Sequence, residues 1–279
     1  MKKYRNMRAL CAAGFLVGLA AYVWIPMSWG LLVSAVAAVV YAGVRERETR
    51  KLFKDINRGL VTLRGQFEAA MDVRRLIDRQ AMPLPPSGGW AASADFVALI
   101  GETLKSHRPR HVMELGSGLS TVFLAEMLSA DSGTHLTSLD HDPMYAEQTR
   151  ARLRVRGLDS QVRVVDAPLQ PVELSQGSYR WYALPKNFEC PPIDLLIVDG
   201  PPSATCPMSR YPALPLLAPF LSQDCIILVD DADRPDEKKM VAQWLKEFGG
   251  VQRRIPLEKG AIIIYLGQSD AALQAARHD

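Results

Sequence analysis

The stretch His111-Val-Met-Glu-Leu-Gly-Ser-Gly-Leu-Ser-Thr121 decides the fold. Its first five residues form a short apolar run, which is typical of a buried strand, and a helical pattern follows the glycines and serines. Small residues at such a junction let the backbone approach a ligand at the N-terminus of a helix. The stretch lacks the Gly-Lys-Ser/Thr ending of a Walker loop. It also lacks the third glycine of the dinucleotide fingerprint, because Ser120 stands at the comparable position.

Strand and helix patterns alternate around this stretch, from Trp90 onward. A helix is predicted at residues 93–106, and strands are predicted at residues 111–115, 135–140, 162–166, 193–199 and 225–230. Two further runs, 251–257 and 261–266, flank a Glu-Lys-Gly turn and predict a closing hairpin. Alternating strands and helices indicate βαβ units. We therefore expect an α/β domain with a mostly parallel seven-stranded sheet and helices on both faces.

Acidic residues end four of the predicted strands, at Asp140, Asp166, Asp199 and Asp230, and Glu114 lies one residue before the end of the first. In open α/β sheets, ligands bind outside the carboxyl ends of the strands. Asp140 follows the glycine loop by about 20 residues, the position from which an acid accepts hydrogen bonds from both hydroxyls of a ribose. One such acid alone is usually a solvated or helix-capping carboxylate. Several at successive strand ends indicate a ligand site.

Four segments resemble class I S-adenosylmethionine-dependent methyltransferases, namely residues 112–118, 138–140, 164–167 and 194–200. The resemblance spans the chain from Trp90 to about Gly267 and implies a Rossmann-like fold. It implies that the glycine loop lies beside the methionine part of S-adenosylmethionine, that Asp140 holds the ribose, and that Asp166 borders the adenine. The cofactor-binding candidates that it implies are Glu114, Gly116, Ser117, Gly118, Ser120, Asp140, His141, Asp166, Ala167 and Asp199.

Proton removal is the chemistry that the chain itself has to supply. A sulfonium is already a strong methyl donor, so the site must align an acceptor and take its proton. The resemblance places Asp199 facing the reacting methyl group, which makes it the first catalytic candidate. His141 follows the ribose acid and is either a second proton acceptor or part of the cofactor pocket. His107 and His111 are predicted to be structural.

Three carboxylates, Asp199, Asp230 and Asp231, are predicted to meet at the ends of the fourth and fifth strands. Oxygen-rich sites of this kind suit Mg²⁺ or another divalent cation, which would hold an acceptor hydroxyl and lower its pKa. The spacing is similar to that of metal-dependent O-methyltransferases and departs from the Asn/Asp-Pro-Pro-Tyr motif of amino-group methyltransferases. The alternative is that Asp230 and Asp231 cap the helix that starts near Arg234.

Trp90, Trp181, Tyr182, Arg210 and Tyr211 are predicted to lie in loops on the acceptor side of the site. Aromatic rings there could stack on a sugar or another ring. Ordinary packing in the core is the alternative.

Residues 9–44 contain no charged side chain, and basic residues stand on both sides of this stretch. A helix needs about 20 apolar residues to cross a bilayer, so the stretch is too long for one span. Pro26 and Gly30 interrupt it, which predicts a transmembrane helical hairpin in residues 1–45, surrounded by membrane lipid at 9–44. Basic flanks on both sides place the rest of the chain on the cytoplasmic side of the inner (plasma) membrane. A signal peptide and a single kinked anchor are the competing interpretations.

Residues 45–80 predict a long amphipathic helix with apolar residues at alternating steps of three and four. These residues are Phe53, Ile56, Leu60, Leu63, Phe67, Ala70 and Ile77. The seam, at residues 53–77, either pairs two chains as a homodimer or docks on the following domain. A Pro/Gly-rich stretch at residues 82–89 ends the helix. We therefore expect three parts: the hairpin at 1–45, the helix and linker at 46–86, and the methyltransferase domain at 87–279.

The composition excludes several classes of protein. With 48% hydrophobic and 23% charged residues, the chain is neither disordered nor collagen-like. A net charge of +3 gives no reason to expect nucleic acid as a partner, and four scattered cysteines signal neither disulfides nor zinc.

The function expected from the sequence is a membrane-anchored methyltransferase that methylates a hydroxyl of a glycan, a lipid-linked molecule or a small molecule. The alternatives are an N-methyltransferase, or a non-catalytic scaffold that uses the same fold.

Overall fold

The computed structural model describes residues 27–77, 83–85, 91–128, 133–186 and 188–267, which form parts of two compact units, 1–63 and 64–279. The helices are α2 (Met27–Leu76), α3 (Ala94–His107), α4 (Leu119–Leu128), α5 (Pro143–Arg156), α6 (Ala213–Leu217), the 3₁₀ helix η1 (Ala218–Phe220) and α7 (Pro235–Phe248). The strands are β1 (His111–Leu115), β2 (His135–Asp140), β3 (Val162–Asp166), β4 (Leu169–Leu174), β5 (Gly177–Tyr182), β6 (Ile193–Val198), β7 (Leu221–Val229), β8 (Val251–Ile255) and β9 (Ala261–Tyr265).

Helix α2 supplies the described part of the first unit. It starts directly after Pro26 and continues through the predicted boundary at residues 45 and 46. Its N-terminal part is long and apolar enough to cross a membrane, and its apolar side chains are exposed, as in Leu31 at 68% and Val39 at 72%. The first helix of the predicted hairpin falls outside the described residues, so the hairpin stays a prediction.

The last turns of α2 belong to the second unit and pack into its core. Val73 and Ile77 are 6% and 5% exposed, and the amide oxygen of Gln66 accepts a hydrogen bond from the backbone N–H of Ala94 at 2.9 Å. Docking on the following domain is thus confirmed for this end of the seam. By contrast, Phe53, Ile56, Leu60, Leu63 and Phe67 are all more than half exposed. The homodimer predicted through these residues stays a prediction.

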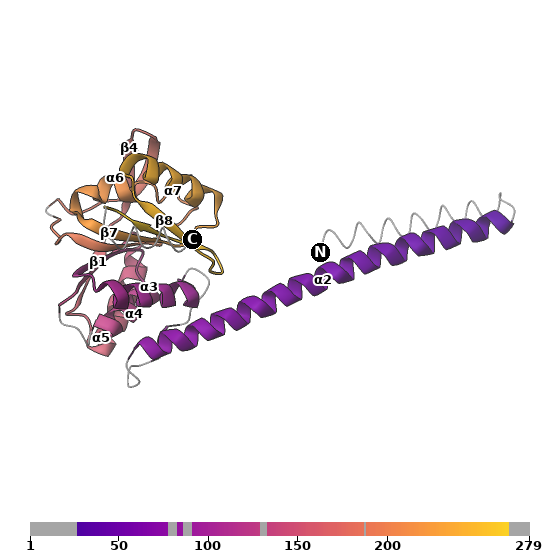
Figure 1. Ribbon diagram of the computed structural model, residues 1–279, viewed down its shortest axis with the longest axis horizontal. Helices are drawn as coiled ribbons and strands as arrows, with labels where there is room; N and C mark the ends of the chain where they lie inside the picture. Colours follow the sequence, from indigo (N-terminus) through magenta and orange to yellow (C-terminus); the bar gives the residue numbers. More distant parts are fainter. Residues whose placement is uncertain (1–26, 78–82, 86–90, 129–132, 187, 268–279) are drawn as a thin grey trace. The chain divides into compact units, whose positions relative to one another are not determined.

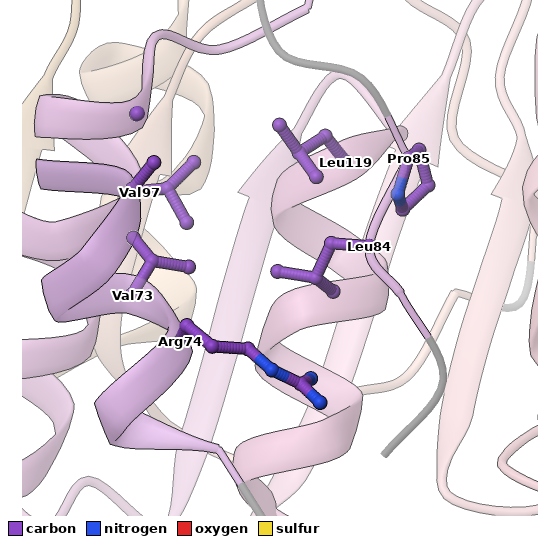
Figure 2. A pocket seen from close by; sticks show the side chains of 8 residues that line it. Val73, Arg74, Leu84, Pro85, Val97 and Leu119 are labelled. Carbon is purple, nitrogen blue, oxygen red and sulfur yellow. The ribbon is translucent and has the colours of Figure 1, made fainter. Parts of the chain in front are cut away.

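A cavity of about 150 Å³ lies where the end of α2 meets α3, α4 and the segment 83–85 (Figure 2). It is lined by Ala70, Val73, Arg74, Leu84, Pro85, Ala94, Val97 and Leu119. Seven of these eight side chains are apolar, so the cavity is a packing gap in the apolar layer on this face of the sheet.

The central sheet has seven strands in the order β3-β2-β1-β6-β7-β9-β8. The first five are parallel, while β9 pairs antiparallel with both β7 and β8. This confirms the predicted α/β fold and its closing hairpin. The chain runs outward from β1 to β3 and then returns to β6 on the other side of β1. A crevice for ligands is therefore expected between the carboxyl ends of β1 and β6.

Two apolar layers cover the sheet. Helices α3, α4 and α5 lie on one face, and α6, α7 and the β4–β5 hairpin lie on the other (Figure 1). Between these layers, β1, β6 and β9 consist mainly of buried apolar residues, and every residue of β1 is buried. Helix α5 begins where the Asp142 carboxylate accepts from the N–H of Met144, with Pro143 at its first position, and it ends at Gly157 in the left-handed conformation.

The antiparallel β4–β5 hairpin is not among the predicted elements. It occupies the connection from β3 to β6, where a parallel sheet ordinarily has a helix. Its aromatic residues Tyr179, Trp181 and Tyr182 are at most 7% exposed and pack against the sheet. The hairpin therefore covers the sheet as a crossover helix would.

Candidate functional site

The glycine loop connects β1 to α4 at the carboxyl edge of the sheet. Gly116 has a φ of 101°, which favours glycine, and its N–H donates to the carbonyl of Leu139 at 2.8 Å. A Cβ atom on Gly116 would lie 3.6 Å from the carbonyl oxygen of Asp199, so the loop lies directly beside the end of β6. A Cβ atom on Gly118 would meet nothing within 4 Å. The loop thus has open space beside Gly118.

Asp140 ends β2 and is tied to this loop. Its Oδ2 atom accepts hydrogen bonds from the Ser117 backbone N–H at 3.0 Å and from the Ser117 hydroxyl at 2.5 Å. Its Oδ1 atom accepts from the N–H of Asp142 at 3.0 Å. A carboxylate offers about four acceptor positions, so one remains on Oδ1. The predicted ribose acid and the predicted loop are therefore in direct contact.

Glu114 lies beneath the loop and is fully buried. Its Oε2 atom accepts from the hydroxyls of Thr121, at 2.5 Å, and Ser138, at 2.8 Å, while Oε1 finds no partner among the described residues. Burial raises the pKa of Glu114, and the hydroxyls of Ser120, Thr121 and Ser138 oppose that rise. Ser120 is itself buried, so its side chain belongs to this network below the loop.

The other cofactor candidates surround Asp140. Ala167 is buried and its N–H donates to the carbonyl of Asp140 at 2.7 Å. Asp166 is about half exposed and pairs with Arg150 of α5 at 2.7 Å, a contact that the sequence did not reveal. His141 is 31% exposed, with its Nδ1 atom 3.6 Å from Asp140 Oδ1. Its place beside Asp140 favours the cofactor pocket over a separate catalytic role.

The three predicted metal ligands come together. Asp199, Asp230 and Asp231 each offer a carboxylate oxygen, and these oxygens lie within 4.8 Å of one another. Asp230 and Asp231 are 1% and 4% exposed, whereas the side chain of Asp199 is 18% exposed. Burial, followed by the charge of Asp230, raises the pKa of Asp199 well above its usual range. Burial and the charge of Asp231 raise the pKa of Asp230.

Arg210 enters this acid cluster from the loop before α6. Its Nη2 atom lies 2.9 Å from Asp231 Oδ2 and 3.4 Å from Asp199 Oδ1, and it also donates to the carbonyl of Asp199 at 2.9 Å. Its Nη1 and Nε atoms donate to the carbonyls of Asp230, at 3.0 Å, and Pro201, at 3.4 Å. The side chain is only 4% exposed. A guanidinium group therefore joins the loops after β6 and β7.

A divalent ion fits this cluster poorly. The spacing of the oxygens would allow one, but an ion between Asp199 and Asp231 would lie against the guanidinium of Arg210. Two like unit charges about 4 Å apart repel by about 4 kcal/mol at an effective dielectric constant of 20, and a divalent ion doubles that cost. The three carboxylates could bind a metal only if the Arg210 guanidinium moved away from them.

The structure does not show the predicted helix-capping role for Asp230 and Asp231. Helix α7 begins at Pro235, and the side chain of its N-cap residue, Arg234, makes no capping hydrogen bond. Asp231 instead adopts a left-handed backbone with a φ of 58°, and its carbonyl accepts from the N–H of Arg234. The carboxylate of Asp231 forms ion pairs with two arginines: Oδ2 lies 2.9 Å from Arg210 Nη2, and Oδ1 lies 2.9 Å from Arg234 Nη2.

The aromatic residues expected on the acceptor side pack in the core instead. Trp181 and Tyr182 lie in β5 rather than in a loop, and Tyr211 is 1% exposed with its hydroxyl bonded to Glu247. These contacts are those of ordinary packing. Trp90 lies outside the described residues.

Tyr182 nevertheless reaches the edge of the site. A Cβ atom on Gly200 would collide with the Tyr182 hydroxyl, and this buried hydroxyl has no hydrogen-bond partner among the described residues. Burial, followed by the charge of Asp140, raises the pKa of Tyr182 well above its usual range, so the hydroxyl stays neutral.

The residues around the loop fit S-adenosylmethionine. Open space beside Gly118 allows close approach, Asp140 keeps an acceptor position, and Glu114 Oε1 is a buried acceptor without a partner in the described part of the chain. These are the groups that a cationic, hydroxyl-bearing ligand can use.

Comparison with known proteins agrees with this geometry. Residues 113–232 match a family model described as a methyltransferase domain. A comparison with curated proteins finds no match.

Several solved structures are similar to the chain. The methyltransferase PaMTH1 of Podospora anserina, bound to S-adenosylhomocysteine, is 17% identical over 64% of this chain and 81% of that one, with a TM-score of 0.49. A methyltransferase from Geobacter sulfurreducens is 14% identical over 76% and 97%, with a TM-score of 0.48. An O-methyltransferase from Bacillus cereus, in complex with S-adenosylhomocysteine, is 15% identical over 74% and 90%, with a TM-score of 0.45.

The family match extends from β1 to the loop after β7, so it contains the glycine loop, Asp140 and the acid cluster. The seven-stranded sheet positions all three at its carboxyl edge. Residues 113–232 thus match the methyltransferase domain family, and they lie in a seven-stranded sheet with a Rossmann-like strand order.

Proposed function

We propose that this chain is a membrane-anchored enzyme that transfers a methyl group from S-adenosylmethionine to a hydroxyl group. The observation that carries the proposal is the contact between the glycine loop and Asp140. Ser117 donates twice to this buried acid, at the ends of the neighbouring strands β1 and β2. Such a pair suits a ribose held next to a backbone loop that admits the rest of the cofactor.

Binding of the cofactor would use three acidic groups. The open acceptor position of Asp140 would take a ribose hydroxyl, and Glu114 Oε1 would lie on the methionine side. Asp166, held by Arg150, would border the adenine.

Proton removal is assigned to Asp199. When bound, S-adenosylmethionine supplies a methyl group on a positively charged sulfur that needs no further activation. Asp199 is the least buried acid of its cluster, so an acceptor can reach it. Its raised pKa makes it a stronger base than an ordinary carboxylate, and it would take the proton of the acceptor hydroxyl.

The exposure of the apolar side chains of α2 supports the proposed membrane anchor. Residues 29–44 form an apolar helical stretch that is exposed to solvent in the chain by itself. Exposed apolar surface of this extent marks an interaction site, and a bilayer would cover it. With basic residues at Arg45, Arg47 and Arg50, we place the catalytic domain on the cytoplasmic side of the inner membrane. A reporter fused after Arg50 tests this topology. A signal from the periplasm would contradict the cytoplasmic location of the catalytic domain.

The acceptor is proposed to be a molecule that the membrane brings to the enzyme, such as a glycan or another lipid-linked compound with a free hydroxyl. A carboxylate base suits a hydroxyl acceptor. The sequence Asp199-Gly-Pro-Pro also departs from the motif of amino-group methyltransferases.

Calorimetric titration of the detergent-solubilised chain with S-adenosylmethionine and S-adenosylhomocysteine tests the cofactor step. We expect binding of both compounds, weakened in the Asp140→Ala variant. If the folded chain binds neither compound, the scaffold alternative is favoured. For the transfer step, membranes are incubated with S-adenosylmethionine carrying a labelled methyl group, and the chemical form of the labelled product is determined. A methyl ether supports the proposal, and a methylamine contradicts it.

A further inference from the structure

Arg210 stands where a metal-dependent enzyme would need a cation. Its Nη2 atom lies between two carboxylates, 2.9 Å from Asp231 Oδ2 and 3.4 Å from Asp199 Oδ1. The side chain is 4% exposed, so Arg210 is as deeply buried as Asp231 and more deeply buried than Asp199. A buried charge persists only when it is paired and hydrogen-bonded, and Arg210 meets both conditions.

The backbone contacts of Arg210 fix its place. The guanidinium donates to the carbonyl oxygens of Asp199, Asp230 and Pro201, which belong to the two loops that carry the acids. A planar group with several donors in a fixed geometry can hydrogen-bond to both loops at once. Arg210 thus orients Asp199 through its carbonyl and its carboxylate.

A second arginine contributes much less. Arg234 reaches Asp231 Oδ1 at 2.9 Å, but its side chain is 42% exposed. Solvent screens such a pair, so it contributes little to the balance of charge inside the cluster. Arg210 is therefore the main internal counter-charge, and Arg234 offers a matched control.

We propose that Arg210 is the built-in cation of the acceptor site, and that the cluster of Asp199, Asp230 and Asp231 works without a divalent metal. Arg210 acts as a positioning residue that holds Asp199 at the end of β6. The catalytic role of Arg210 rests on the proposed methyl transfer. The exclusion of metal does not depend on that proposal, and it can be measured without cofactor or acceptor.

The first experiment is a titration of the solubilised full-length chain with Mn²⁺, followed by electron paramagnetic resonance and by the thermal unfolding midpoint. We expect the wild-type chain to bind no Mn²⁺ at this cluster and to unfold at the same temperature with and without a chelator. Stoichiometric Mn²⁺ binding that disappears in the Asp230→Asn variant would overturn the proposal.

The second experiment removes the guanidinium. Arg210→Met leaves three carboxylates without their internal counter-charge, so its affinity for Mn²⁺ should rise by more than roughly 100-fold. Arg210→Lys keeps a positive charge and should still exclude Mn²⁺, while Arg234→Gln should behave as the wild type does. If Arg210→Met folds by circular dichroism and still takes up no Mn²⁺, Arg210 is not what excludes the metal and the proposal fails. If Arg210→Met does not fold, the titrations of the wild type and of Arg210→Lys still test whether the cluster excludes Mn²⁺.

Methyl transfer supplies an independent readout once an acceptor is known. The proposal expects full activity in the presence of a chelator, and restoration of part of the activity by Lys but not by Met at position 210. An absence of methyl transfer would count against the proposed function, whereas Mn²⁺ binding by the wild-type cluster would count against the built-in cation. The two failures are therefore distinguishable.

Discussion

Ser117 and Asp140 are joined by two hydrogen bonds that end on one carboxylate oxygen, from the serine N–H at 3.0 Å and from its hydroxyl at 2.5 Å. The two residues belong to neighbouring strand ends, 23 positions apart in the chain. The acid therefore shapes the loop before any cofactor arrives, and one substitution should affect both binding and local order.

Asp140→Ala should weaken S-adenosylmethionine binding by roughly 10- to 100-fold, because a hydrogen bond to a charged group contributes about 1.5–3 kcal/mol. Calorimetry measures the loss. Asp142→Ala is the control, since the Asp142 side chain caps α5 and lies outside the loop contact. It should cost about 1 kcal/mol of stability and leave cofactor affinity unchanged. Equal affinities in the wild type and Asp140→Ala would refute the ribose assignment.

The two glycines of the loop should respond differently to alanine. Gly116→Ala strains a backbone with a φ of 101°, so its thermal midpoint should fall. Gly118→Ala adds a methyl group where nothing lies within 4 Å, so its fold should be kept while cofactor binding is lost. Thermal unfolding and calorimetry on both variants check this. If Gly118→Ala binds S-adenosylmethionine normally, the cofactor does not approach the loop there.

Glu114 should make the domain less stable as the pH rises. Burial holds its folded-state pKa above the unfolded value, so its contribution is full below the unfolded pKa and is lost as the pH rises through the folded pKa. Glu114→Gln removes that loss, so its thermal midpoint relative to wild type should rise as the pH increases above the usual range of a glutamate pKa. Glu147→Gln is the control with the opposite sign, because hydrogen bonding to Arg154 lowers the pKa of Glu147. A pH-independent difference for Glu114→Gln would contradict this prediction.

Asp199→Asn should separate binding from transfer. The amide cannot take a proton from the acceptor, so the turnover rate should fall by about 10² to 10⁴, whereas S-adenosylmethionine affinity should change little. In the wild type, the rate should rise with pH through the raised pKa of Asp199, since only the ionised carboxylate is a base. Steady-state rates and calorimetry on the same preparation provide the test. A variant that retains full turnover would assign the base to another group.

Ile77→Ala should destabilise the catalytic domain by about 2–5 kcal/mol, because it empties a buried position in the core. Leu60→Ala changes an exposed side chain of α2, the helix that Ile77 directly follows, and should stay within about 0.5 kcal/mol. Urea unfolding of both variants gives the comparison. Similar losses would mean that Leu60 is covered in solution, as the predicted homodimer requires.

The sheet was predictable because β1, β2, β3, β6 and β7 are short segments, separated by helical patterns, that end in acids or at the glycine loop, and because the closing hairpin surrounds a recognisable turn. The β4–β5 hairpin was not, because its Ser175-Gln176 turn carries none of the Asn-Gly or Asp-Gly signals of a tight hairpin. The acid cluster could be predicted from the strand ends alone. The contacts of Arg210 with this cluster could not be predicted, because Arg210 is 11 residues from Asp199 and 21 residues from Asp231, and such distant contacts leave no local sequence pattern.

The extent of α2 determines where the chain can be cleaved without destabilising the second unit. The catalytic unit starts at Arg64, inside the helix, and Val73 and Ile77 from its last turns complete the core. Proteolysis before Arg64 would leave the core residues of α2 with the catalytic unit. Cleavage after Ile77 would take part of its interior away. A shortened form of this chain can thus be stable only if it keeps the last turns of α2 together with the second unit.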